Sequence, residues 1–374
     1  MSGCVFHFGM HKTGSSSIQN SLYHGLGDPA FHYADLGQQN ASARIVTAFR
    51  AEPETQNMNR KLGLSREQLQ PQIRETLERL HRELGHCTRQ TVILSGEHIA
   101  FLKQTELRRL REFLRGHTSE LRAVGYIRAP RSYMESVFQQ HLQGGHGVFE
   151  LERLLPRYRT RFEKLEAIFG AASMHYWYFE PESFPGGCVV RDFCRRLQID
   201  FDARAIQRVN EGLSLPAVRL LYAYRKFGPG YGTGEVAVRQ NAALVRKLRE
   251  LAGPRLRLHP ELVAPVIARH AAEIDWMEQR LQRSLDEAAA EPGAGAIRAE
   301  HELLCFEPRT LEWLGAQLGV RTTTRLRPDS SAEEVASRMH ELRLEADRAE
   351  MAARTGFRRG VRRLWRRILP RTLR

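Results

Sequence analysis

Short runs rich in apolar and aromatic residues alternate with amphipathic segments through the first half of the chain. The short runs cover residues 4–8, 91–94, 121–127 and 173–179. Runs of this length are typical of strands buried on both faces of a parallel sheet. Apolar residues at helical spacing predict helices that start near residue 18 and cover residues 65–84, 104–116, 131–143 and 150–170. The alternation predicts an α/β fold, in which a central parallel sheet is covered by helices on both faces.

The second half of the chain has mainly helical patterns, from about residue 200 onward. We expect one long helix over residues 260–285 and a linker or surface loop over the Ala-, Gly- and Pro-rich residues 287–296. Ser331 and Glu334 have the spacing of a capping box, which predicts a charged helix to about residue 353. The expected organisation is therefore one α/β domain over residues 1–330, with helical additions, and a separate C-terminal helix and basic tail over residues 331–374.

Charge changes this picture mainly at the C-terminus. The 374 residues include 57 basic and 43 acidic side chains, which gives a formal net charge of +14. Residues 355–374 hold eight Arg and no acidic residue, so more than half of the excess lies in this tail. A basic excess indicates an anionic partner, such as a phosphate-rich nucleotide, a nucleic acid or a membrane surface.

Cysteine usage and hydropathy bear on the compartment. The five Cys have no spacing typical of a zinc site, and an odd number suits reduced thiols better than a disulfide framework. We find no apolar run near the roughly 20 residues that a membrane span needs. The chain enters a strand-like run at residues 4–8 instead of an apolar leader, so we expect a cytoplasmic protein.

A small-residue loop joins the first predicted strand to the first predicted helix. Such a loop directs several backbone N–H groups at one point, where the positive end of the helix dipole also lies, and this arrangement binds phosphate. In a nucleotide-triphosphate P-loop the Lys follows the last Gly, whereas here Lys12 precedes Gly14. The candidate phosphate-binding residues are His11, Lys12, Thr13, Gly14, Ser15, Ser16 and Ser17.

The order Lys-Thr-Gly-Ser-Ser-Ser at residues 12–17 resembles the 5′-phosphosulfate loop of sulfotransferases that use 3′-phosphoadenosine 5′-phosphosulfate (PAPS). The resemblance extends through ordered motifs over about residues 1–215. It implies a P-loop-like three-layer α/β/α fold and an enzyme that transfers sulfur-containing groups. The implied cofactor is PAPS, with 3′-phosphoadenosine 5′-phosphate (PAP) as product, and the resemblance implies no metal.

The same family binds the 3′-phosphate of the nucleotide with an Arg at the end of a later strand and a Ser eight residues further on. Arg128 and Ser136 have this spacing, after the run at 121–127. An Arg fork suits a phosphate dianion, although a surface ion pair is the simpler role for Arg128. Phe179 stands where family members carry a Tyr near the adenine, and it fits a core position equally well.

Sulfuryl transfer needs a cation near the bridging oxygen and a base for the acceptor. Lys12 fits the first role. Glu97 and His98 follow the run at 91–94, where related sulfotransferases place their catalytic Glu or His. We favour Glu97 as the base and keep His98 as the alternative, while either side chain could instead cap a helix. His11 is expected to line the acceptor site, and His7 to be a core residue.

Apolar residues in the tail, among them Leu364, Trp365 and Ile368, recur at helical spacing between pairs of Arg. This pattern predicts a cationic amphipathic helix, which suits a peripheral position at an anionic membrane better than nucleic-acid binding. The expected acceptor is then a hydroxyl or amine of a glycan, glycolipid or other small molecule. Two alternatives stay open: a P-loop kinase of a small molecule or sugar, and a non-catalytic nucleotide- or membrane-binding protein.

Overall fold

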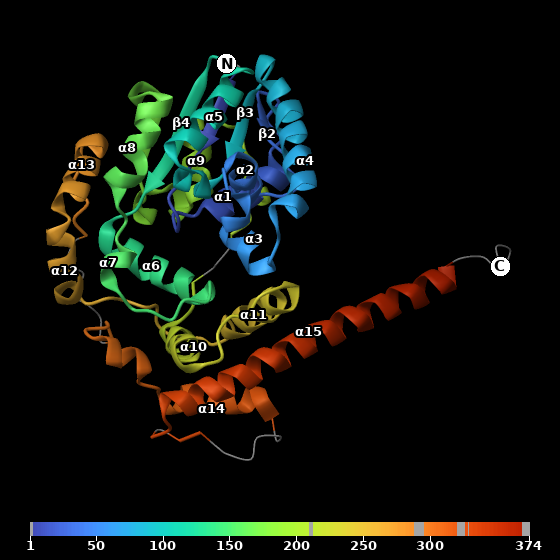
Figure 1. The fold of residues 1–374 in the computed structure, drawn as a ribbon, viewed down its shortest axis with the longest axis vertical. Coiled ribbons are helices and arrows are strands. Elements are labelled where there is room, and N and C mark those ends of the chain that lie inside the picture. Colours follow the sequence, from blue (N-terminus) through green and yellow to red (C-terminus); the bar gives the residue numbers. More distant parts are fainter. Residues whose placement is uncertain (1–2, 209–211, 288–294, 320–325, 328, 369–374) are drawn as a thin grey trace. The chain divides into compact units, whose positions relative to one another are not determined.

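The computed structural model describes residues 3–208, 212–287, 295–319, 326–327 and 329–368, with side chains up to residue 353 (Figure 1). The chain forms two compact units, and each is described by itself. The first unit comprises Met1–Val137, Glu150–Glu211 and Leu258–Gly295. The second comprises Phe138–Phe149, Gly212–Arg257 and Ala296–Arg374. Helix α6 (Pro130–Gln143) begins in the first unit and ends in the second.

The first unit is built on a five-stranded sheet in the order β2-β3-β1-β4-β5, with every neighbouring pair parallel. The strands are β1 (Gly3–His7), β2 (Phe31–Tyr33), β3 (Thr91–Ser95), β4 (Leu121–Ile127) and β5 (Met174–Tyr178). The predicted α/β class with a central parallel sheet is confirmed. Strands lie on both sides of β1, so its carboxyl end lies where the strand order reverses, the usual place for a ligand in such a sheet.

One strand was missing from the sequence prediction. The sequence pattern predicts no regular element over residues 28–63, but they contain β2 as well as helices α2 (Ser42–Phe49) and α3 (Asn57–Leu62). The strand has only three residues, and its pattern is too short to show a period. Its place at the edge is fixed by pairing with β3, in which Phe31 lies opposite Thr91.

Helices cover both faces of the sheet, as Figure 1 shows. On one face, Val5, Ile93 and Val124 pack with α1 (Ser15–Gly25) and α9 (Val189–Leu197). On the other face, Phe6 and Phe8 contact aromatic rings of α8 (Tyr158–Phe169) at centroid distances of 5.5 Å. The remaining described α-helices of this unit are α4 (Arg66–Leu84), α5 (Gln104–Arg115), α7 (Leu151–Leu154), α12 (Pro260–Arg269) and α13 (Ala271–Leu281).

Two predicted helices are interrupted. The segment 150–170 is split into α7 and α8, because Pro156 holds the residue before it in an extended conformation. The expected helix over 260–285 is split into α12 and α13 at His270. Here a tertiary contact stabilises the break between the two helices. Glu152 accepts a hydrogen bond from Arg269 Nη2 at 2.6 Å and lies 2.6 Å from His270 Nε2. Periodicity alone does not reveal such a contact.

The second unit is helical and contains α10 (Leu215–Phe227), α11 (Glu235–Leu248), α14 (Pro308–Leu318) and α15 (Ala332–Ile368). The capping box is confirmed, because Ser331 N donates to Glu334 Oε2 at 2.8 Å and Glu334 N donates to Ser331 Oγ at 3.2 Å. Helix α15 packs on α10 and α11 and continues well past residue 353. Its buried Arg343 donates to the carbonyl of Tyr231 at 2.8 Å. These contacts group α15 with the preceding helices, so the compact units do not follow the expected boundary at residue 330.

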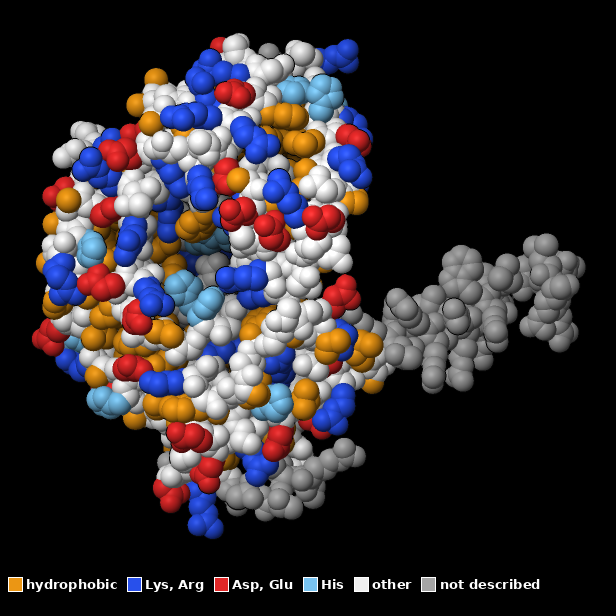
Figure 2. Space-filling model, viewed as in Figure 1, with side chains coloured by type: hydrophobic (Ala, Val, Ile, Leu, Met, Phe, Trp, Pro, Cys, Tyr) orange, Lys and Arg blue, Asp and Glu red, His pale blue; other side chains and the backbone are white. Residues whose placement is uncertain are grey.

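The state of the cysteines, the hydropathy of the helices and the distribution of charge can be compared with the sequence predictions. Cys4, Cys87, Cys188 and Cys194 are buried free thiols, and Cys305 is exposed. No helix among the described residues is both long and apolar enough to span a membrane. On the face drawn in Figure 2, basic and acidic side chains are interspersed. The side chains of the predicted membrane-binding tail, residues 355–374, lie outside the described residues, so that expectation stays a prediction.

Candidate functional site

The loop after β1 has a conformation that few sequences can adopt. Three of its residues have positive φ: Gly9 at 47°, Lys12 at 66° and Gly14 at 78°. Gly14 is the residue before α1, and the Thr13 hydroxyl donates to the carbonyl of Met10 at 2.6 Å. A non-glycine residue in this region, such as Lys12, costs free energy of order 1–3 kcal/mol, and such strain concentrates at ligand sites.

Close packing explains the glycines of this loop. A Cβ on Gly14 would lie 2.6 Å from Cγ1 of Val189, the first residue of α9. A Cβ on Gly9 would lie 3.0 Å from Ser15 Oγ and 3.4 Å from Cβ of Glu97. The loop therefore lies directly against both α9 and the segment after β3.

The start of α1 has the features of an anion site. Ser15 is buried, and its Oγ has no hydrogen-bond partner among the described residues. The first N–H groups of a helix have no intrahelical acceptor, and the helix dipole favours negative charge there. A buried hydroxyl without a partner is costly, so this position suits a ligand that accepts a hydrogen bond.

His7 differs partly from the satisfied core residue that the sequence predicted. It is buried, and its Nδ1 lies 2.8 Å from Ser95 Oγ, which also accepts from Gln19 Nε2 at 3.0 Å. Its Nε2 has no partner in the part of the chain that the structure describes. Burial lowers the pKa of His7 to about 4, so the ring is neutral at pH 7.

Arg128 joins the loop to α6. Its Nη1 donates to the carbonyl of Lys12 at 2.8 Å and to Ser136 Oγ at 2.7 Å. Its Nε donates to Ser132 Oγ at 3.1 Å. The lysine-led loop and the Arg–Ser couple, which the sequence places more than 100 residues apart, therefore meet at one guanidinium. Of the predicted nucleotide-binding residues, this contact brings Lys12, Arg128 and Ser136 together.

Two residues of this region were missed from the sequence. Ser132 lies in the first turn of α6, and its backbone N–H donates to Glu287 Oε1 at 3.2 Å and Oε2 at 3.0 Å. Glu287 Oε2 also lies 3.7 Å from Arg131 Nε. The sequence analysis assigned Glu287 to a linker or surface loop, and Glu287 lies outside regular secondary structure, but the contact of its side chain with α6 was not expected. Residues 288–294 of that segment lie outside the described residues. The sequence carries no local signal for a carboxylate that reaches α6 from 155 positions away.

Phe179 follows β5, where its N–H donates to the carbonyl of Ile127 at 2.8 Å. Its ring packs against Tyr126 and Phe184 at centroid distances of 6.1 Å and 5.5 Å. The guanidinium carbon of Arg128 lies 5.7 Å from the same ring. Phe179 is thus both part of the core and a neighbour of Arg128, so the two roles expected for it do not exclude each other.

The second cluster of the site follows β3. Glu97 and His98 open a 3-10 turn (Glu97–Phe101), and the N–H of His98 donates to Ser42 Oγ at 3.2 Å. The ring of His98 lies 4.5 Å from the ring of His11. Donor atoms of His11, Glu97 and His98 all lie within 4.8 Å of one another. The loop after β1 and the turn after β3 therefore bring both candidate bases beside the phosphate loop.

Aromatic and cationic groups surround this cluster. The ring of Phe101 lies 5.2 Å from His11 and 6.1 Å from His98, and the guanidinium of Arg161 lies 4.9 Å from the Phe101 ring. Burial, and then the charge of Arg161, lowers the pKa of His98 to about 4. His98 is therefore a neutral imidazole at pH 7, able to accept a hydrogen bond or a proton but weakly basic.

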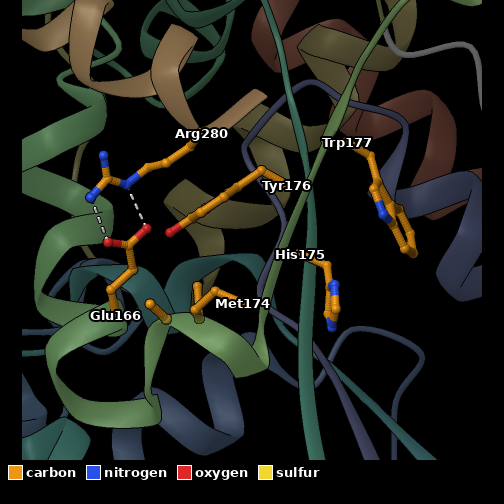
Figure 3. Close-up of a pocket in the computed structure, with 7 residues that line it drawn as sticks. Glu166, Met174, His175, Tyr176, Trp177 and Arg280 are labelled. Atoms are coloured by element: carbon orange, nitrogen blue, oxygen red, sulfur yellow. Dashed lines mark hydrogen bonds and ion pairs between the residues drawn. The ribbon is translucent and has the colours of Figure 1, made fainter. Parts of the chain in front are cut away.

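A cavity of about 370 Å³ lies elsewhere in the first unit, beside edge strand β5 (Figure 3). Tyr176 points toward the ion pair of Glu166 and Arg280, while His175 and Trp177 point away on the other side of the strand. Met174, the first residue of β5, lines this cavity, whereas the phosphate loop follows the last residue of β1. The cavity is thus not part of the candidate site.

The structure is that of an α/β protein, and its candidate anion-binding loop lies at the carboxyl edge of a parallel sheet. No family model and no curated protein matches the chain. Among solved structures, it is similar to the crystal structure of a sulfotransferase from Alicyclobacillus acidocaldarius, with a TM-score of 0.36 and 11% identity over 77% of this chain and 98% of that chain. A similarity this low carries no argument, so the fold assignment rests on the strand order and the parallel pairing.

Proposed function

We propose that this protein is a sulfotransferase that moves the sulfuryl group of PAPS to a hydroxyl or amine of a glycan or lipid-linked acceptor. The observation that carries the proposal is the convergence on Arg128. Its guanidinium contacts both the backbone of Lys12 and the hydroxyl of Ser136. A nucleotide with a phosphate at each end needs two anion-binding elements close to each other. The loop that contains Lys12 and the couple of Arg128 and Ser136 supply them.

On this proposal the two phosphate groups bind at different elements. The N–H groups at the start of α1 suit the 5′-phosphosulfate, as does the Ser15 hydroxyl, for which the described part of the chain offers no hydrogen-bond partner. Arg128 and Ser136 suit the 3′-phosphate, because a guanidinium fork with an added hydroxyl matches the oxygens of a phosphate. The ring of Phe179, beside Arg128, offers an apolar surface for the adenine.

The transfer itself is an in-line displacement. The acceptor oxygen or nitrogen forms a bond to sulfur while the bond from sulfur to the bridging oxygen breaks, and its electron pair stays on the leaving phosphate. Lys12 stabilises the charge that develops on that oxygen. Glu97 takes the proton from the acceptor, with His98 as the alternative base. The neutral state of His98 at pH 7 allows this role, although its lowered pKa makes it a weak base.

The deciding experiment is a thermal-shift titration of the full chain with PAP, and in parallel with ATP and Mg²⁺. A ligand present at 100 times its Kd stabilises the folded state by about 2.7 kcal/mol. We expect PAP to raise the melting temperature at concentrations where ATP does not. A shift with Mg²⁺-ATP and none with PAP would replace the proposal with a kinase. Binding of PAP with no transfer to a broad panel of acceptors would leave a nucleotide-binding protein.

A further inference from the structure

Three side chains that ligate transition metals converge beside the phosphate loop. We propose that His11, Glu97 and His98 form a binding site for a divalent transition-metal ion of the Zn²⁺ class. Their donor atoms lie within 4.8 Å of one another, and His11 is buried while the other two are partly buried. This proposal concerns metal binding, so it does not rest on the proposed transfer reaction.

The sheet explains why these residues meet. Strands β1 and β3 are neighbours, with His7 opposite Ser95 at their ends, and the N–H of Gly96 donates to the carbonyl of His7 at 2.9 Å. His11 follows β1 by four residues and Glu97 follows β3 by two. The backbone on both sides of the cluster is therefore held by sheet hydrogen bonds, as a preformed metal site requires.

The donor set selects the class of metal. Two imidazoles and one carboxylate are the ligands of many catalytic zinc sites and of iron(II) sites with two His and one carboxylate. Mg²⁺ and Ca²⁺ prefer oxygen ligands and would use only Glu97 well. Three protein ligands leave at least one coordination position for water, an anion or a hydroxyl group.

The spacing is close to what a metal needs. Zinc bonds of about 2.1 Å in a tetrahedron place neighbouring donors about 3.4 Å apart. The donors of the cluster would therefore have to approach one another by at most about 1.4 Å. Rotation of the three side chains about their own bonds can supply this movement while the strand ends stay in place.

Charged groups around the cluster limit its affinity. Arg161, whose guanidinium lies 4.9 Å from the Phe101 ring, adds a positive charge that lowers the pKa of His98. Lys12 adds a second positive charge on the neighbouring loop. Glu97 contributes the negative charge that a cation requires, so the carboxylate is the most important of the three ligands.

Metal binding and base catalysis would use the same lone pairs. If Glu97 or His98 is the base of the proposed transfer, a bound metal ion removes it, and the metal-loaded protein is inhibited. This consequence rests on the proposed function. The binding itself is measured without nucleotide or acceptor, so failure of one proposal is distinguishable from failure of the other.

The test is a titration of the chelator-treated full chain with Co²⁺, followed by its visible absorption, with Zn²⁺ added afterwards as competitor. We expect one equivalent of Co²⁺ to bind with the intense spectrum of a four-coordinate ion, and Zn²⁺ to displace it. His11→Ala, His98→Ala and Glu97→Gln should each lower the affinity by at least about 100-fold, since even loss of a group that only hydrogen-bonds to a metal ligand costs about 10–100-fold. Glu97→Gln keeps the shape of the side chain, and a melting curve for each variant separates lost ligation from lost folding.

The matched control is His81→Ala. His81 and His117 form another close imidazole pair, with ring nitrogens 2.8 Å apart, and His81 is exposed on α4. This variant should bind Co²⁺ like the unchanged protein. Octahedral, weakly absorbing Co²⁺, or a loss of binding in His81→Ala with retention in Glu97→Gln, would overturn the proposal.

Discussion

The candidate site has two sides, a phosphate side and an acceptor side. Different kinds of interaction hold each of them together. On the phosphate side, Arg128 makes directional hydrogen bonds of 2.7 to 3.1 Å to one carbonyl of the loop and to two hydroxyl groups of α6. On the acceptor side, His11, His98 and Phe101 meet through ring contacts at centroid distances of 4.5 to 6.1 Å. Hydrogen bonds weaken steeply away from their preferred geometry, whereas ring packing tolerates several arrangements.

The difference between hydrogen bonding and ring packing suggests a different role for each side of the candidate site. A preformed anion site can recognise the constant part of a reaction, the nucleotide, because its donors are already in place. A cluster of rings and one carboxylate can accept different partners, including an acceptor molecule or a metal ion. The comparison therefore predicts that changes on the phosphate side alter nucleotide binding, and that changes on the acceptor side do not.

The largest effect is expected at Lys12, which belongs to both sides. On the proposed mechanism, Lys12→Ala removes the cation that stabilises the leaving phosphate, and loss of one such group lowers kcat by about 10² to 10³. Transfer from PAPS, measured with a labelled sulfuryl group, should fall by this factor, while PAP affinity falls far less. A purified Lys12→Ala protein with full activity would refute the assigned role.

A second Lys12 variant separates charge from strain. Because Lys12 has a φ of 66°, Lys12→Gly should remove the charge and also relieve about 1 kcal/mol of backbone strain. We expect this variant to melt at a higher temperature than Lys12→Ala while being equally inactive. Recovery of activity in the more stable glycine variant would show that the backbone, and not the ammonium group, limits the reaction.

A smaller effect is expected from Arg128→Ala, which tests the phosphate side alone. Hydrogen bonds to a charged group contribute about 1.5–3 kcal/mol, so PAP should bind about 10- to 100-fold more weakly by calorimetry. Arg128→Lys should recover only part of this loss, because an ammonium cannot form the same fork. Co²⁺ binding at the acceptor side should be unchanged. Equal loss of PAP and Co²⁺ binding would mean that the two sides do not function separately.

The two sides also differ in how well the sequence revealed them. The phosphate loop and the couple of Arg128 and Ser136 were predicted because each is a local pattern at a strand end, and the strand order brings them together. The sheet itself was predicted except for β2, whose three residues carry no period. Local patterns of this kind can be predicted from the sequence, because they depend only on neighbouring residues.

Features that depend on distant partners were not predicted. The break at His270 is held by Glu152, and α6 is capped by Glu287; neither carboxylate lies within 100 residues of its partner. The sequence placed Glu97 and His98 near the loop but gave no sign that His11 would lie 4.5 Å from His98. Side-chain direction after a strand depends on the packing of the whole sheet edge.

The smallest expected effect concerns Glu287, and its direction is informative. Its carboxylate accepts both hydrogen bonds from Ser132 N, at the positive end of α6 and close to Arg128. A 3′-phosphate bound by Arg128 would bring a second negative charge to this end. Glu287→Gln keeps an oxygen for Ser132 N but removes the charge, so PAP should bind about 2- to 5-fold more tightly, as charge effects of 0.3–1 kcal/mol at a helix end imply.

A matched control distinguishes this electrostatic effect from a loss of helix capping. Glu273 caps α8 in the same way, accepting from Arg159 N at 2.6 Å and from Thr160 N at 3.2 Å. Glu273→Gln should destabilise the protein about as much as Glu287→Gln but leave PAP affinity unchanged. Weaker PAP binding in Glu287→Gln would mean that the carboxylate supports the nucleotide site by holding α6. Tighter binding would mean that the negative charge of Glu287 opposes a phosphate bound by Arg128.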